Sequence, residues 1–472
     1  MNSRRLAFSL IVVAACDAPN QAARDDSEPS HAAGEQQQLE SPPATDEDEP
    51  RPAPIQAATA AALAPVPAAV ERTPVATRIA RQMLILRAAP DQKAALRGRI
   101  PLGEAFHVFE YVPGPECAGK GWGDVGQGAY ACLEPTRKAG DVVPRTLPEM
   151  RDSNLAPFFY AKVKAGQVAR RWRSLSAWTQ GEAPLDTLEP EHDYAFTNRR
   201  RVKGEIVLID DRARMVLEQE VTRYRPSRFE GRDLVALPIP AARVFAWGIT
   251  WPENPVLTEA REGAPLAASV DYQAEMLLLP DPTSNADGTW WSLEGGGFIQ
   301  AKHLGLWSLP TQPADVADDE LWIDVELDQQ TLTVMRGPSP EFATLVSTGF
   351  KGPTPKGLFR ISMKQAIGQM QSRADAEESY NVEAVPFVQY FSGNFALHGA
   401  FWHYRFGHKI SHGCVNLSPR DAKRVYDLTA PHAEVGWLHV YEGEAALGTT
   451  VRVRKGDDAV TDKREAPRLF EG

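Results

Sequence analysis

The sequence lacks an apolar run long enough to cross a bilayer, and it lacks any basic patch. Its N-terminal apolar stretch, residues 6–13, is far shorter than the roughly 20 residues that a spanning helix needs, and no second candidate follows. The formal net charge is −11, and residues 17–50 alone carry ten acidic side chains against one arginine. The rest of the chain is close to neutral. These features exclude a chain threaded through a membrane and give no support for nucleic-acid binding.

The first sixteen residues have the layout of an export signal. Two arginines precede the apolar residues 6–13, and two alanines lead directly to Cys16. This ending resembles a bacterial lipobox, which implies cleavage before Cys16 and its diacylation. An ordinary secretory signal with a chance cysteine is the alternative. We therefore expect residues 1–16 to be a lipoprotein signal peptide, and the protein to be lipid-anchored at the periplasmic face of a bacterial envelope.

Residues 17–78 lack the composition of a folded domain. They are rich in alanine, proline and acidic side chains and have no aromatic residue. Such a segment cannot bury enough apolar surface to offset its ordering entropy, so we expect a disordered tether. The remaining chain of about 400 residues is too long for one core and predicts two to four domains.

Cysteine is scarce, with only four in 472 residues. Cys117 and Cys132 flank a glycine-rich stretch that predicts a hairpin, and in an oxidising compartment they could pair. If Cys16 is lipidated, Cys414 remains as a single exported thiol. Such a thiol is either a small buried hydrophobe or a reactive group.

Two stretches share a tryptophan followed by glycines four and six residues later. Each predicts strand, tight turn and strand, with glycine supplying positive φ. The residues are Trp122, Gly126 and Gly128, and Trp291, Gly295 and Gly297. The pattern resembles bacterial SH3-like modules, which implies small β-barrels at residues 79–145 (the first module) and 243–310 (the second module). Two unrelated hairpins are the alternative.

The remaining segments are also rich in β-structure. Residues 150–240 (the middle region) predict a β-rich unit of unknown type. Residues 320–443 (the C-terminal domain) alternate apolar and polar side chains across a polar turn at 328–330, and further strands follow. The expected fold class is mainly β and multidomain, with one or two short helices in the C-terminal domain and a tail at 444–472.

One helix is signalled clearly in the C-terminal domain. Ser418 stands as N-cap, Pro419 as the first helical residue and Asp421 at the third position. This is a variant of the capping box.

A cysteine and a histidine are the candidate catalytic pair. His398 ends a predicted strand, and fifteen residues separate it from Cys414. A free thiol is only a few per cent ionised at neutral pH, so a nucleophilic cysteine needs a base. A histidine supplies that base and can return the proton to a leaving amine. Gly413 lets the backbone approach a substrate and direct amides at an oxyanion. The pattern predicts an acyl-transfer site.

This pattern resembles the L,D-transpeptidase (YkuD-type) family. The signature comprises His398, Ser411, His412, Gly413, Cys414, Val415 and Asn416. The upstream "STGFKGPTPKGLFRI" resembles the strand and turn that precede the active-site flap of that family. The resemblance covers residues 320–443 and implies a β-sandwich catalytic domain.

The resemblance also implies roles for individual residues. Cys414 would be the nucleophile, and His398 would act as base and then acid, with its tautomer held by the carbonyl of Gly399. Loop and oxyanion-hole support would come from Ser411, His412, Gly413 and Asn416. Weaker candidates for substrate binding are Tyr380, Trp402 and Arg405.

A zinc site is the alternative use of the histidines. His403 and His408 could be combined with His398, His412 and Cys414. Their spacing is irregular, however, and no HExxH or CxxC unit is present. We expect no metal and no cofactor.

The reaction implied by the resemblance acts on peptidoglycan stem peptides. Cys414 would attack the carbonyl of the third residue of a tetrapeptide stem, D-alanine would leave, and an amine of a neighbouring stem would complete a 3→3 cross-link. With water as acceptor the protein would be a peptidoglycan hydrolase, and with a protein amine it would attach that protein to the wall. A non-catalytic wall-binding lipoprotein is the alternative outside enzymology.

Overall fold

The structure is a computed structural model that describes residues 13–14, 72–117, 119–151, 155–372, 380–444 and 446–456. The expected lipidation site at Cys16 lies outside these ranges, as do most of the expected tether and residues 457–472. Within the described ranges, no helix is both long and apolar enough to cross a membrane.

The C-terminal domain begins with a six-stranded sheet. Its spatial order is β18 (Arg232–Asp233), β29 (Ser339–Leu345), β28 (Thr331–Arg336), β27 (Leu321–Glu326), β36 (Thr450–Arg454) and β30 (Gly357–Arg360). The β27–β28 hairpin turns at residues 328–330, where the polar turn was predicted. β36 runs parallel to β27, so the domain extends to residue 454 and not only to 443. The expected tail at 444–472 therefore includes a strand of the sheet.

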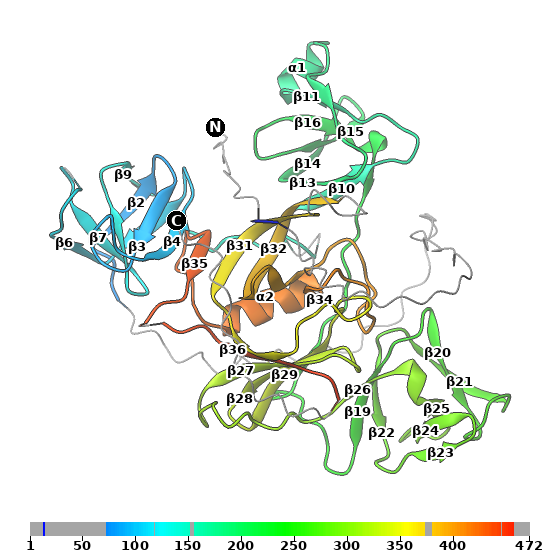
Figure 1. The fold of residues 1–472 in the computed structure, drawn as a ribbon. Coiled ribbons are helices and arrows are strands. Elements are labelled where there is room, and N and C mark those ends of the chain that lie inside the picture. Colours follow the sequence, from blue (N-terminus) through cyan, green and yellow to red (C-terminus); the bar gives the residue numbers. More distant parts are fainter. Residues whose placement is uncertain are drawn as a thin grey trace, which may run out of the picture.

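The second sheet of this domain carries the candidate site. Its members are β31 (Met363–Gln371), β32 (Asn381–Ser392), β33 (Phe395–Gly399), β34 (Val415–Leu417) and β35 (His439–Tyr441). The short strand β1 (Val13–Ala14) pairs with β31 in parallel. One apolar core joins both sheets to helix α2 (Pro419–Leu428), with contributions from Val325 of the first sheet, Leu397 of the second and Val425 of the helix. Figure 1 shows α2 between the two sheets.

Helix α2 begins as the sequence predicted. Ser418 is the N-cap, and its hydroxyl accepts a hydrogen bond from the Asp421 N–H at 3.2 Å. The Asp421 carboxylate differs from a capping box, because it accepts from the Thr344 hydroxyl at 2.6 Å and from the Gly231 N–H at 3.0 Å. These two bonds fix the start of α2 to β29, which contains Thr344, and to Gly231, which immediately precedes β18.

Neighbouring units extend the second sheet at two places. In the middle region, β13 (His192–Phe196) pairs in parallel with β32. In the first module, β4 (Leu96–Ile100) pairs antiparallel with β35. An exposed sheet edge presents unpaired N–H and C=O groups, and these two strands satisfy such groups. The accessory units are thus joined to the C-terminal domain by backbone hydrogen bonds.

The first module consists of two antiparallel sheet segments. One is β5 (Ala105–Val108), β2 (Ala76–Ala80) and β9 (Thr136–Lys138); the other is β4, β3 (Leu84–Arg87), β8 (Ala129–Cys132), β7 (Trp122–Gly126) and β6 (Glu110–Val112). The predicted hairpin is β7–β8, and a disulfide joins Cys117 to Cys132 with a Cα–Cα distance of 5.6 Å. Trp437 of the C-terminal domain enters the core of this module. The described strands do not close into the expected barrel.

The middle region is β-rich, as predicted, with one short helix. Its strands are β10 (Phe159–Val163), β11 (Arg170–Trp172), β12 (Asp186–Thr187), β13, β14 (Asn198–Val202), β15 (Glu205–Ile209), β16 (Met215–Leu217) and β17 (Val221–Arg223). The helical segments are α1 (Leu175–Thr179) and the 3-10 turn η1 (Glu218–Glu220). β17, β10 and β13 continue the sheet of the C-terminal domain, whereas the other strands form a sheet of their own.

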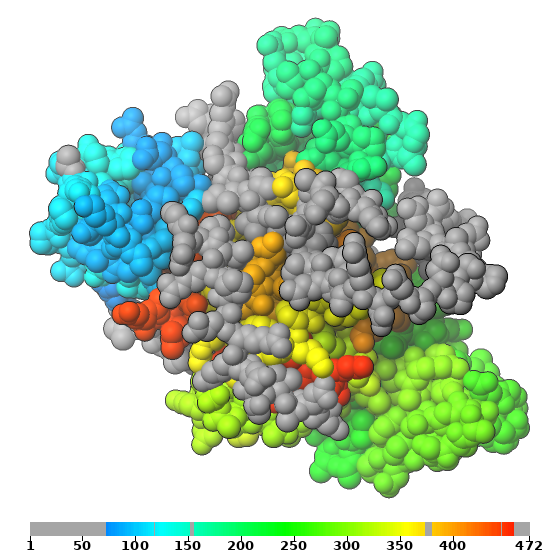
Figure 2. Space-filling model, in the orientation of Figure 1, coloured from blue at the N-terminus to red at the C-terminus, as the bar shows by residue number. Residues whose placement is uncertain are grey.

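The second module also divides into two sheets and, over its described residues, forms no closed barrel. One sheet has β22 (Glu275–Leu278), β19 (Val244–Gly248) and β26 (Leu304–Trp307). The other has β21 (Leu266–Asp271), β20 (Glu253–Leu257), β25 (Phe298–Gln300), β24 (Gly288–Ser292) and β23 (Thr283–Asn285), with η2 (Ala301–His303) following β25. Figure 2 shows the first module, the middle region and the second module projecting from the C-terminal domain.

Candidate active site

The pairing of β33 with β34 brings the predicted nucleophile and base together. The strands are parallel, and His398 stands opposite Asn416. Cys414 immediately precedes β34, and its sulfur accepts a hydrogen bond from the Ala396 N–H at 3.4 Å. Side chains alternate along a strand, so Cys414 and Asn416 share the face that carries Ala396 and His398. The opposite face, with Leu397, enters the core of the domain.

Cys414 is buried, with 3% of its surface exposed. A nucleophile must be a thiolate. The Cys414 thiol must therefore lose its proton before any acyl transfer.

His398 is held in its neutral form. It is 2% exposed, and its Nδ1 lies 3.2 Å from the Gly399 carbonyl oxygen, the partner that the family resemblance implied. A carbonyl only accepts, so Nδ1 carries the hydrogen and Nε2 is left to take a proton. Burial lowers the pKa of His398 to about 4, against the opposing effect of the Gly399 hydrogen bond.

A hydrogen-bonded turn supports Cys414. The Ser411 hydroxyl donates to the Cys414 carbonyl at 2.6 Å and accepts from the Gly413 N–H at 3.1 Å. The Thr354 hydroxyl donates to the Gly413 carbonyl at 2.8 Å and accepts from the Gly349 N–H at 2.9 Å. Ser411 and Gly413 thus lie where loop support was predicted. The Gly413 N–H is occupied by Ser411, however, and in this conformation is not available to an oxyanion.

Gly413 has a conformational reason to be glycine. Its φ of 137° lies in a region that other residues rarely adopt. A side chain at the facing Gly349 would come within 3.1 Å of the Gly413 Cα. The two glycines allow the strand-end turn and the Cys414 loop to approach closely.

His412 and Tyr380 meet at the outer side of the loop. The His412 side chain is exposed, and its ring stacks on Tyr380 with centroids 5.0 Å apart and an interplanar angle of 24°. His412 is therefore a surface residue of the loop, unlike the buried His398. Tyr380, the weakest assignment from sequence, does contact the loop that carries Cys414.

The connection between β33 and β34 holds the other aromatic and histidine candidates. Trp402 packs near His398, with ring centroids 5.7 Å apart. Arg405 is exposed, and its carbonyl accepts from the Ser347 hydroxyl at 2.7 Å. His403 lies against Asn416 at 3.1 Å, whereas the His408 Nε2–H donates to the Ile249 carbonyl of the second module at 2.7 Å. These two histidines have different partners, and no group of three metal-ligating side chains gathers among the described residues.

The start of helix α2 does not lie beside the sulfur. β34 separates Cys414 from Ser418, and four extended residues span about 13 Å. The positive end of the helix dipole acts within roughly its first turn, so it is not the activator of this thiol.

Several contacts of the site carried no sequence signal. Thr354 follows from no pattern, and Tyr272 and Gln273 of the second module bond the carbonyls of Tyr404 and Phe406. These residues lie far from Cys414 in sequence, so only the tertiary fold brings them there.

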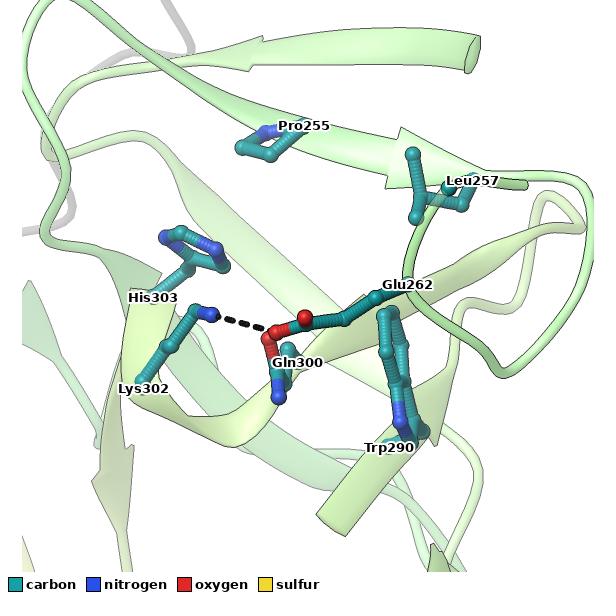
Figure 3. A pocket seen from close by; sticks show the side chains of 8 residues that line it. Pro255, Leu257, Glu262, Trp290, Gln300, Lys302 and His303 are labelled. Atoms are coloured by element: carbon teal, nitrogen blue, oxygen red, sulfur yellow. Dashed lines mark hydrogen bonds and ion pairs between the residues drawn. The ribbon is translucent and has the colours of Figure 1, made fainter. Parts of the chain in front are cut away.

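Hollows among the described residues also lie outside the Cys414 loop, and two of them differ in their lining. One, of about 290 Å³, lies in the second module between Leu257, Trp290 and His303, with Glu262 directed across it at Lys302 (Figure 3). None of its lining residues belongs to the C-terminal domain. The other, of about 470 Å³, is bounded by the middle region and the β31–β32 connection and includes Tyr380 and several acidic or amide side chains. Its lining is Glu189, Pro190, Glu191, His192, Gln371, Ser372, Tyr380 and Asn381.

Comparison with known proteins identifies the C-terminal domain. Residues 320–453 match the family profile YkuD, the L,D-transpeptidase catalytic domain. YciB of Bacillus subtilis (strain 168), which bears the name of an L,D-transpeptidase, is 25% identical over 146 residues, covering 27% of this chain and 72% of that protein.

Solved structures of similar proteins cover parts of the chain. The L,D-transpeptidase (Yku) from Stackebrandtia nassauensis is 26% identical, covers 30% of this chain and 58% of its own, and has a TM-score of 0.21. The L,D-transpeptidase from Mycobacterium smegmatis is 21% identical, covers 50% and 89%, and has a TM-score of 0.24. The chain thus spans little more than half of the Stackebrandtia structure. By the family match, the chain carries a YkuD-family L,D-transpeptidase catalytic domain at residues 320–453.

Proposed function

We propose that the protein is a cysteine-dependent L,D-transpeptidase that forms 3→3 cross-links between peptidoglycan stem peptides. The observation that carries the proposal is the β33–β34 pairing, which brings His398 and Cys414 to one face of the sheet within the matched domain. No metal or cofactor takes part in the proposed chemistry.

The first half-reaction forms a thioester. The Cys414 thiol passes its proton to Nε2 of His398, and the sulfur attacks the carbonyl of the third stem residue. The carbon–nitrogen bond to the terminal D-alanine breaks, and His398 returns the proton to the leaving amine. The neutral, Nδ1-protonated ring of His398 is suited to this step because its Nε2 is an acceptor.

The second half-reaction transfers the acyl group. An amine of a neighbouring stem attacks the thioester, gives a proton to His398, and forms an amide while the Cys414 thiol is restored. Water as acceptor would make the protein a hydrolase, and a protein amine would make it a protein-to-wall ligase.

The proposal also covers the location of the enzyme and the role of its accessory modules. Diacylation of Cys16 would hold the enzyme at the periplasmic face of the envelope, with the tether spanning to the wall. The first and second modules, with their likeness to SH3-like units, would contact glycan or peptide.

The experiment uses the full chain with Cys16→Ser, which leaves Cys414 as the one cysteine besides the Cys117–Cys132 pair. It is incubated with disaccharide tetrapeptides, and products are identified by mass. We expect a cross-linked dimer with release of D-alanine, and none with Cys414→Ala. Tripeptide alone would indicate hydrolysis. Unchanged tetrapeptide with both proteins would overturn the proposal in favour of a non-catalytic wall-binding lipoprotein.

A further inference from the structure

The second module forms hydrogen bonds to the loop between β33 and β34. The Tyr272 hydroxyl donates to the Phe406 carbonyl at 3.2 Å, and the Gln273 amide donates to the Tyr404 carbonyl at 2.9 Å. Both donors lie in the tight connection between β21 and β22. Backbone carbonyls of the loop are therefore fixed by side chains that belong to another unit.

A second contact holds the far end of the same loop. The His408 Nε2–H donates to the Ile249 carbonyl, and a side chain added at Gly407 would come within 2.7 Å of Ile249 Cγ2. The Trp251 ring covers Tyr404 at 5.2 Å between centroids. The segment 402–408 thus has little freedom to move while the second module is in place.

The segment 402–408 contains His403, whose ring lies against Asn416. The Arg405 N–H donates to His403 Nδ1 at 3.2 Å. An N–H needs an acceptor, so Nδ1 is unprotonated and the hydrogen of the neutral ring is on Nε2. Burial, with smaller effects of His398 and Arg405, lowers the pKa of His403 to about 3, so the ring stays neutral at physiological pH.

The His403 tautomer decides how the Asn416 amide is oriented. Nε2 lies 3.1 Å from Asn416 Nδ2, which would place two donors against each other, while the buried Oδ1 has no partner. Asn416 is 4% exposed. Exchanging the oxygen and nitrogen of the amide resolves both conflicts, because Oδ1 then accepts from Nε2–H. The NH₂ group takes the position that has no partner in the described structure.

The position of Asn416 places that NH₂ group where it could donate to a substrate. Asn416 stands opposite His398 and two residues after Cys414, on the face that holds both. A buried donor without a protein partner there is available to a substrate oxygen, where a preorganised donor stabilises developing charge. The Gly413 N–H cannot serve while it is bonded to Ser411.

We propose that His403 is a positioning residue that orients the Asn416 amide toward the reacting acyl group, and that the second module serves catalysis by holding the loop that carries His403. This proposal rests on the proposed acyl-transfer function. It assigns the module a part in the reaction itself, in addition to any wall contact.

The first test compares two substitutions of His403 in the full chain with Cys16→Ser. His403→Gln keeps a side-chain N–H near the place of Nε2, whereas His403→Leu removes it. Acylation by a carbapenem is followed by intact mass, which separates the binding constant from the rate constant. We expect His403→Leu to lower the rate constant by about 10- to 100-fold with little change in binding. We expect His403→Gln to recover most of it.

The second test asks whether the second module acts through His403. Tyr272→Phe should lower the acylation rate constant in the parent protein, but should have no further effect in the His403→Leu background, because both changes release the same amide. Tyr111→Phe, at an exposed tyrosine of the first module, is the matched control and should change nothing. The melting temperature is measured for every variant.

The outcomes separate this inference from the proposed function. If the parent protein takes no acyl group, the proposed function fails. If the parent is acylated but His403→Leu reacts at the same rate, or His403→Gln is as slow as His403→Leu, the positioning role is wrong. Independent, multiplicative losses from Tyr272→Phe and His403→Leu would disprove the part assigned to the module.

Discussion

At the scale of single residues, the site combines a buried histidine with a buried cysteine. His398 and Cys414 are both nearly inaccessible, and each is fixed by backbone groups of the strands beside it. They differ from His412 and Arg405, whose side chains are exposed. The consequence is that substitutions at the pair test chemistry, provided that folding is checked separately.

Loss of either member of the pair should abolish acylation. Cys414→Ala removes the nucleophile, and His398→Ala removes its base, so each should reduce carbapenem adduct formation to the background rate. The double variant should be no slower, because residues acting as one unit are not additive. Tyr111→Phe, at the exposed tyrosine of the first module, serves as the control and should retain the adduct, measured by intact mass. An undiminished adduct in Cys414→Ala would place the nucleophile elsewhere.

Buried histidines should make the fold sensitive to acid. Burial lowers the pKa of His398 to about 4 and that of His439 to about 3, whereas the unfolded value is about 6.5. The unfolded chain then binds more protons than the folded one below pH 6.5, so stability is full above this pH and falls as pH decreases toward 4. Each histidine contributes about 1.4 kcal/mol per pH unit in this window.

The buried Asp421 carboxylate opposes this effect. Burial raises the pKa of Asp421 to about 6, so the folded state gains a proton between pH 6 and 4 and offsets about one histidine. We therefore expect a net loss of stability between pH 6 and pH 4 in urea titrations. His439→Phe should reduce the slope by about 1.4 kcal/mol per pH unit. A slope unaffected by that substitution would contradict the assignment.

At the scale of elements, charge pairing joins the last strand to the first sheet. Asp324 of β27 accepts from Arg452 at 2.6 Å and from Arg454 at 2.9 Å, and both arginines belong to β36. The carboxylate is 2% exposed. These contacts explain why a segment expected to be a tail is part of the domain: two alternate arginines meet one buried carboxylate across parallel strands.

Removing that carboxylate should destabilise the domain strongly. Asp324→Ala leaves two buried guanidinium groups without their counter-charge and should cost about 3–5 kcal/mol. Glu294→Ala breaks an exposed pair with Arg243 and should cost less than about 1 kcal/mol. Urea denaturation of the two variants compares the values directly, and equal losses would be inconsistent with the buried pair.

At the scale of the whole molecule, the accessory units are integrated with the catalytic domain. β13 and β4 pair with strands of its sheet, and Tyr272 of the second module bonds its loop. The proposed lipid anchor adds a further level, because the tether would limit the enzyme to the space near a membrane.

The anchor predicts a change of location. The wild-type protein should fractionate with membranes, whereas Cys16→Ser should be released or should remain unprocessed. Cys414→Ala is the matched control and should stay with the membranes, since it changes a cysteine that has no part in lipidation. A Cys16→Ser protein that is cleaved normally and remains membrane-bound would exclude lipidation at this residue.

The sequence by itself determined the local features of this protein. The 328–330 hairpin, the α2 cap at Ser418 and the pairing of Cys117 with Cys132 follow from short-range patterns, which depend on neighbouring residues alone. The Cys414 and His398 candidates were also visible, because their signature lies within one segment.

Only the tertiary structure decided which distant groups meet. Sheet edges are satisfied by strands from other units: β4 of the first module continues the sheet of the C-terminal domain, and neither expected barrel closes over the described residues. The place of β36, the bond from Thr354 to the Gly413 carbonyl and the bonds of Tyr272 to the β33–β34 loop all depend on contacts between residues far apart in sequence. Such contacts are selected by the summed packing and hydrogen bonding of the whole chain, for which no local pattern exists.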